Sequence, residues 1–128
     1  MIGFCYGGHP ACWASAENPD LVVGGVVCHP SMQLETYAFG GDHLSLARSV
    51  KCPFLIAPAE GDLATFGPGT EFAAALGESS KGGECVITPY PEMAHGWVPR
   101  GDLSKPEVAR DVEAVMGAAI AFFETTMA

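Results

Sequence analysis

The stretch "GFCYGG", residues 3–8, has the pattern of a sharp turn between a buried strand and a helix. Glycines are expected on both sides of Cys5, because a Cβ at Gly3 or Gly7 would clash within the turn. The helix that follows would point its N-terminus at the cysteine sulfur and favour the thiolate. This turn predicts an α/β fold and makes Cys5 the first candidate for a reactive side chain.

Three short apolar runs follow the turn: "LVVGGVVC" (21–28), "PFLIAP" (53–58) and "ECVITPY" (84–90). Continuous apolarity of this length is typical of strands buried on both faces of a parallel sheet. Helices are expected at 10–17, 43–50 and 69–80, and a long last helix is expected from Ser104. Ser104 would cap it, Glu107 would complete a capping box with Ser104, and Pro106 suits the first turn. The order of elements predicts one α/β domain over residues 1–128, with flanking helices.

Composition narrows the classes of function. The chain has 128 residues and a formal net charge of -9, which leaves no basic surface for nucleic acid and disfavours anionic membranes. No stretch resembles a signal peptide or is long and apolar enough to cross a bilayer. Five cysteines without a CxxC pair are typical of a reducing compartment. We therefore expect a cytoplasmic protein that binds a small molecule.

Cys5 occupies the nucleophile position of the G-x-S-x-G elbow, with Cys in place of Ser. In folds built around this elbow, an acidic residue follows one strand and a histidine follows the last strand. Asp62 follows "PFLIAP" and His95 follows "ECVITPY", which gives the order Cys, Asp, His. The backbone N–H of Tyr6, the residue after the cysteine, would be an oxyanion donor.

Other interpretations of these residues stay open. Cys5 could be a small buried residue, as free cysteines often are. Glu60 competes with Asp62, and three histidines compete with His95: His9, His29 and His43. His29 closes a predicted strand and could pack under the site or line it. The histidines lack HxxxH or HxH spacing, so no metal site is expected. Core packing is expected for the remaining cysteines, Cys12, Cys28, Cys52 and Cys85.

Four segments together resemble the dienelactone hydrolase family: "GFCYGG", "CHPS" (28–31), "APAEGDLATFGP" (57–68) and "PEMAHGWVPRGD" (91–102). The resemblance covers essentially the whole chain. It implies a partial α/β-hydrolase fold and a Cys–His–Asp triad that opens lactones or esters through an acyl-enzyme, without a cofactor. On matching positions, Cys5 is the nucleophile, His95 the general base and Asp62 its orienter. Arg100 would help bind a substrate carboxylate, and Trp97 is a candidate for the pocket wall.

The resemblance also implies a difference. Family members carry roughly another half-domain before the elbow, so this chain is expected to correspond to their C-terminal half, with the last three strands of the sheet. The strand at 21–28 would then be an open apolar edge through which the chain self-associates. The alternative function is that of a catalytically inactive domain, acting as a binding module or as a thiol redox sensor. A reactive Cys5 without ester turnover would favour the sensor.

Overall fold

The computed structural model describes residues 1–128 and contains one four-stranded parallel sheet. Its strands are β1 (Ile2–Phe4), β2 (Gly25–Cys28), β3 (Phe54–Ala57) and β4 (Val86–Ile87), in the spatial order β1-β2-β3-β4. One row of paired residues, Gly3, Val27, Ile56 and Ile87, crosses all four strands. The predicted α/β class with a parallel sheet is confirmed.

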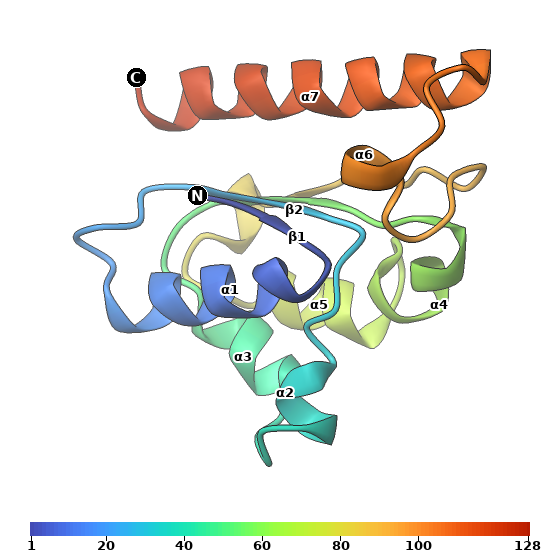
Figure 1. The fold of residues 1–128 in the computed structure, drawn as a ribbon. Coiled ribbons are helices and arrows are strands. Elements are labelled where there is room, and N and C mark those ends of the chain that lie inside the picture. The colour runs from blue at the N-terminus through green and yellow to red at the C-terminus, as the bar shows by residue number, and fades with distance from the viewer.

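Helices cover both faces of this sheet (Figure 1). On one face lie α1 (Gly8–Glu17), α3 (His43–Ser49) and α5 (Glu71–Gly77), and on the other lies the long helix α7 (Pro106–Thr126). The loops contain short helices and 3-10 turns that the sequence patterns did not predict. These are η1 (Cys5–Gly7), α2 (Leu34–Tyr37), η2 (Glu60–Asp62), α4 (Leu63–Phe66), η3 (Gly82–Glu84) and α6 (Trp97–Arg100).

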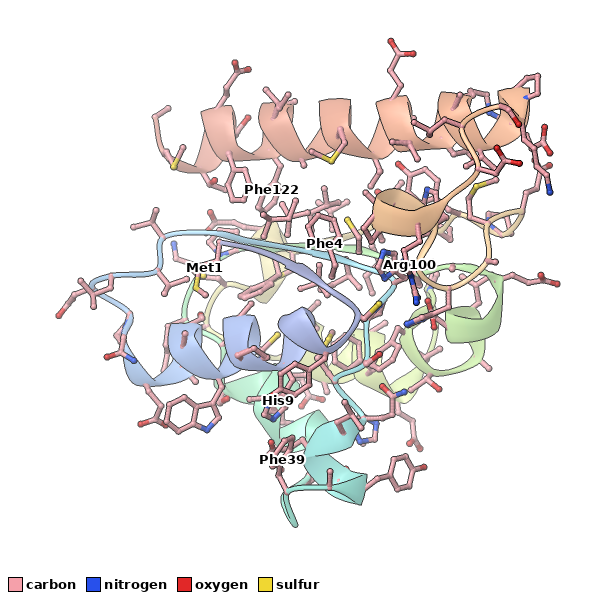
Figure 2. All side chains as sticks on the ribbon, in the orientation of Figure 1. Met1, Phe4, His9, Phe39, Arg100 and Phe122 are labelled. Atoms are coloured by element: carbon pink, nitrogen blue, oxygen red, sulfur yellow. The ribbon has the colours of Figure 1, made fainter.

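Successive strand residues point to opposite sides of the sheet, and both sides are covered, so the strands are apolar at every position. Val27, Phe54 and Ile56 join one apolar cluster with residues of α1, α3 and α5. Val26, Cys28, Leu55 and Ala57 join a second cluster with Trp97, Val115 and Ala119. Figure 2 shows Phe4 and Phe122 in the layer between the sheet and α7, whereas His9 and Phe39 lie on the opposite side.

Two sequence-based expectations about the sheet are wrong. A strand precedes the elbow, because Ile2–Phe4 pairs with Val26–Cys28, so the sheet has four strands rather than three. The run 21–28 is therefore an interior strand between β1 and β3, and only its last four residues are extended. Leu21 and Val23 precede that strand and are 81% and 52% exposed.

The expected capping box of the last helix is also wrong. The N-cap of α7 is Lys105, with no side-chain cap, and Pro106, expected in the first turn, is the first helical residue. Ser104 instead donates from its hydroxyl and its backbone N–H to the carboxylate of Asp102. No helix combines the length and the apolar character that crossing a bilayer would require.

We propose that the purified chain self-associates through the outer edge of β1. Met1 and Ile2 are 50% and 40% exposed there, and an unpaired strand edge readily pairs with a second copy. Sedimentation at micromolar concentration should give a species larger than the monomer. Ile2→Lys should shift it to the monomer, because a charge on an edge strand opposes pairing. Val86→Lys, at the opposite edge of the sheet, is the matched control. A monomeric unsubstituted chain would rule the proposal out.

Candidate active site

All four parallel strands end at the same edge of the sheet, and the candidate residues lie in the segments that follow them. Cys5 follows β1, His29 follows β2, Asp62 follows β3 and His95 lies between β4 and α6. In open parallel sheets this is the edge at which ligands bind. The strand order therefore brings together side chains that are up to 90 residues apart in the sequence (95 − 5 = 90).

Cys5 sits in a strained turn. Its φ of 50° lies in the left-handed region, which a residue with a Cβ rarely adopts. Gly3 lies against the carbonyl group of Gly7, and Gly8 lies against the side chains of Val27 and Met32, so neither has room for a Cβ. Gly7 itself has open space and a helical φ of −57°, so the expectation that it must be glycine is wrong. The tight packing of the elbow falls on Gly3 and Gly8.

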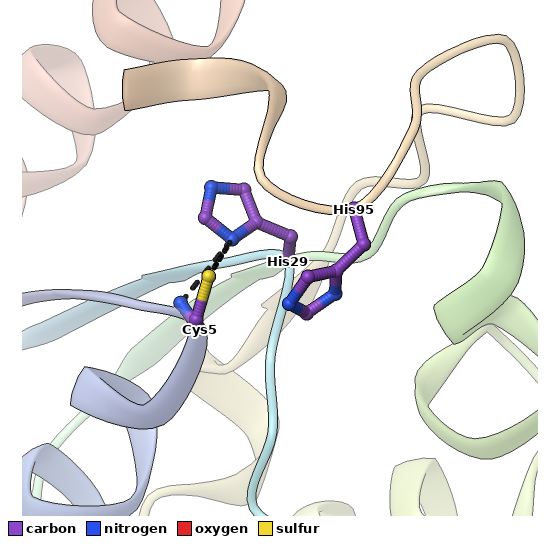
Figure 3. A group of neighbouring side chains, drawn as sticks. All are labelled: Cys5, His29 and His95. Carbon is purple, nitrogen blue, oxygen red and sulfur yellow. Dashed lines mark hydrogen bonds between the residues drawn. The ribbon is translucent and has the colours of Figure 1, made fainter. Parts of the chain in front are cut away.

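The closest partner of Cys5 is His29 (Figure 3). Nδ1 of His29 accepts the backbone N–H of Cys5 at 3.2 Å and lies 3.1 Å from Sγ. The imidazole is fully buried, between the rings of Phe4 and Trp97 at centroid distances of 5.9 and 5.3 Å. Burial, with a smaller contribution from His95, lowers the pKa of His29 to about 4. His29 is therefore neutral near pH 7.

His95 and Asp62 form a hydrogen-bonded pair. Nδ1 of His95 lies 2.8 Å from Oδ1 of Asp62, and Oδ2 of Asp62 accepts the backbone N–H of Ala59 at 3.0 Å. The two loops are also joined through their backbones, since Glu60 N–H donates to the carbonyl of Met93 and Ala59 bridges to Tyr90. Asp62, rather than the rival Glu60, is the acid that contacts His95.

Cys5, His29 and His95 each place one sulfur or nitrogen atom within 4.8 Å of the other two. Sulfur and imidazole nitrogen are ligands of zinc, with bonds of about 2.3 Å to sulfur and 2.0 Å to nitrogen. In a tetrahedral zinc site these bond lengths place a ligand sulfur and a ligand nitrogen about 3.5 Å apart. The sulfur and the His29 nitrogen are closer than that, at the 3.1 Å of a direct hydrogen bond. His95 is bonded to Asp62 through Nδ1, and Figure 3 shows its other nitrogen on the side of Cys5. The geometry is that of a cysteine sulfur hydrogen-bonded to one imidazole, with a second imidazole nearby.

The other candidate residues surround this group. Tyr6 is the second residue of η1, where backbone N–H groups have no partner within their own turn. A cavity of about 590 Å³ is lined by His95, Trp97, Arg100 and Lys105, together with acidic residues of α7 and its preceding loop. Arg100, labelled in Figure 2, is exposed and makes no ion pair, since no acidic group lies within 4.0 Å of it. Trp97, in contrast, is 3% exposed and packs edge-on against His29. Trp97 thus contributes at most one edge to the cavity wall.

The remaining cysteines and histidines lie elsewhere. Burial raises the pKa of Cys12, Cys52 and Cys85, and raises that of Cys28 to about 12, which keeps these thiols protonated. Cys12, Cys28 and Cys52 are core residues as predicted, while Cys85 is half-buried. The other two histidines bond to residues outside the site: His9 to Glu35 and His43 to Thr36.

This fold is that of part of an α/β-hydrolase. The chain superimposes with a TM-score of 0.63 on a solved structure titled "Acylaminoacyl peptidase in complex with Z-Gly-Gly-Phe-chloromethyl ketone". The alignment, at 24% identity, covers 96% of this chain and 23% of the peptidase, so the chain spans about a quarter of that protein. No curated protein matches the sequence.

The family follows from the sequence as a whole. The family model described as "Dienelactone hydrolase family" matches residues 1–127, and the chain belongs to that family. The resemblance stated from four short segments is thereby confirmed at the level of the family. The correspondence to a C-terminal half stays a prediction.

The sequence patterns selected Cys5, Asp62 and His95 as candidate site residues, whereas His29 was one of several histidines that competed with His95. The contact between His29 and Cys5 depends on the pairing of Phe4 with Cys28, which no local pattern reveals. The available signal was the position of His29 directly after a buried strand. That signal indicates the functional edge of a parallel sheet.

The buried His29 predicts that acid destabilises the fold. Its pKa is about 4 in the folded chain and about 6.5 when unfolded, so the unfolded chain binds more protons between these values. The free energy of unfolding should therefore fall from about pH 7 to about pH 4, with up to about 3 kcal/mol due to His29. Urea unfolding across this range should give a flatter pH dependence for His29→Leu. His43→Gln should leave the wild-type slope, and an unchanged slope in His29→Leu would contradict the assignment.

Proposed function

We propose that this protein is a hydrolase that cleaves a small lactone or carboxylic ester through Cys5, His95 and Asp62. One observation carries the proposal. A cysteine with left-handed backbone, at the start of a helix, lies beside a histidine whose other ring nitrogen is hydrogen-bonded to a carboxylate. This combination serves nucleophilic catalysis in unrelated hydrolases. Membership of the dienelactone hydrolase family supports a hydrolase in general.

In the proposed reaction, the sulfur of Cys5 turns from His29 toward His95 and gives up its proton to the free ring nitrogen. The thiolate attacks the ester carbonyl, and the tetrahedral oxyanion is held by the backbone N–H of Tyr6. Collapse forms a thioester and expels the alkoxide, which takes the proton from His95. His95 then deprotonates a water that cleaves the thioester, and the acid and the Cys5 thiol are released. Asp62 fixes the tautomer of His95 throughout.

The cavity next to His95 suggests the class of substrate. Arg100 and Lys105 line it without ion pairs, while two of its three acidic residues, Asp102 and Glu92, are bound to Ser104 and Arg110, and the third is Glu107. Free cations of this kind attract a carboxylate. We therefore propose a substrate with a carboxylate several bonds from the scissile ester, with Arg100 as its partner.

Substitution of the acid tests the triad. Asp62→Asn keeps the shape of the side chain but favours the wrong tautomer of His95, and should lower kcat on a 4-nitrophenyl ester by about 10⁴. Glu60→Gln, two residues away, is the control and should retain activity. Cys5→Ala should abolish both the initial burst of 4-nitrophenolate and the steady-state turnover of the ester. If the wild-type chain is alkylated at Cys5 but turns over no ester, the thiol-sensor alternative is favoured instead.

The role of Arg100 is tested with two esters of similar size, 4-nitrophenyl hemisuccinate and 4-nitrophenyl butyrate. Arg100→Gln should lower kcat/KM for the charged ester about ten- to hundredfold, the value of a hydrogen bond to a charged group, mainly through KM. The uncharged ester should be unaffected. Arg48→Gln, which removes a cation of α3 that is paired with Glu78, should affect neither ester. An equal loss on both esters would contradict carboxylate recognition.

A further inference from the structure

Two residues other than glycine have positive φ in this chain, and they contact each other. They are Cys5, at 50°, and His29, at 39°. Strained backbone persists only where the surroundings hold it, and it clusters at functional sites. The strain at Cys5 belongs to the elbow, whereas the strain at His29 has no equivalent explanation in the proposed reaction. It aims the imidazole at Cys5.

The hydrogen bonds of His29 define its protonation state. A backbone N–H can only donate, so Nδ1, which accepts from Cys5, carries a lone pair and no proton. The ring proton is therefore on Nε2, which is buried and has no partner among the protein groups. The ring faces the titratable or charged groups of Cys5, His95, Asp62 and Arg100. A proton on His95 or the charge of Arg100 opposes a charge on His29, whereas the carboxylate of Asp62 favours one, and burial outweighs it.

The same lone pair identifies the donor in the contact between Sγ and Nδ1. A thiolate has no proton to offer and would face the nitrogen lone pair at 3.1 Å. A thiol, in contrast, donates S–H to Nδ1. This arrangement of the site therefore holds a protonated Cys5, with its sulfur beside His95.

We infer that His29 is a positioning residue, whose buried Nδ1 binds both the backbone N–H and the thiol of Cys5 and so holds the elbow and the protonated nucleophile in place. The inference rests on the proposed function in taking Cys5 as the nucleophile. His29 does not receive the proton that the reaction moves. It accepts the elbow N–H that would otherwise lack a partner, and it releases the thiol to His95 when the sulfur turns.

Alkylation of Cys5 by iodoacetamide, followed across pH by mass spectrometry of the Cys5 peptide, tests this role. His29→Leu removes the acceptor of the thiol proton, so half-maximal alkylation should occur at a pH lower by about half to one pH unit, the value of one neutral hydrogen bond. His29→Asn places an amide oxygen near the position of Nδ1 and should keep the wild-type midpoint. His29→Gln, whose amide lies near the position of Nε2 instead, should behave like His29→Leu if the leucine variant does not fold.

The outcomes separate the two proposals. A midpoint that rises in the folded Leu and Gln variants would show that His29 acts as the base, and a midpoint that stays unchanged would show a packing role only. Either result overturns the inference. Ester hydrolysis by the wild-type chain is measured separately. An inactive wild type that shows the expected shift refutes the proposed function alone, and an active wild type without the shift refutes the role of His29 alone.

Discussion

The hydrogen bond from the backbone N–H of Cys5 to Nδ1 of His29 is the constraint on which the rest of the site depends. The ladder between β1 and β2 ends at the pair Phe4 and Cys28, and the imidazole provides the next acceptor in line. It thereby satisfies a backbone donor where the chain leaves the extended conformation for a left-handed one. An unpaired buried N–H at that point would add the cost of a lost hydrogen bond to the cost of the strain.

The rest of the site is placed by the sheet itself. Because both faces are covered, all residues of β2 and β3 except Gly25 are anchored in one of two apolar clusters, and the register between neighbouring strands is fixed. The loops after β3 and β4 gain a further connection in the bridge between Ala59 and Tyr90. Asp62 and His95 therefore meet on a backbone that is already joined, and their hydrogen bond orients the imidazole without having to hold the loops together.

The elements of this fold that are long or strongly patterned could be predicted from the sequence. The apolar run 53–58 gave a strand at Phe54–Ala57, and Pro106 marked the first residue of α7. The sequence did not reveal β1, because three residues form no pattern and their extension comes from pairing with β2. The expected capping box does not form, because Ser104 donates its hydroxyl to the carboxylate of Asp102 instead of bonding to the first turn of the helix.

For the site, chain order was sufficient to select Asp62 and His95, because residues after neighbouring parallel strands share one edge of the sheet. It was not sufficient for His29, whose importance depends on the depth at which it is buried. Residues 28–31 read as the end of a strand whether the histidine lies under Cys5 or points to solvent. Packing against rings that include Phe4 and Trp97 removes the imidazole from water, and this burial keeps it neutral.

Burial gives two neighbouring histidines different tasks. The rings of His29 and His95 are 5.2 Å apart, so a charge on one opposes a charge on the other. His95 is partly exposed and lies against the carboxylate of Asp62, which balances a proton on its ring. His29 has no such carboxylate in contact and is shut away from water, so it stays neutral, with Nδ1 as its one acceptor. The two histidines thus differ in environment, and in the proposed reaction His95 is the group that takes the proton from Cys5.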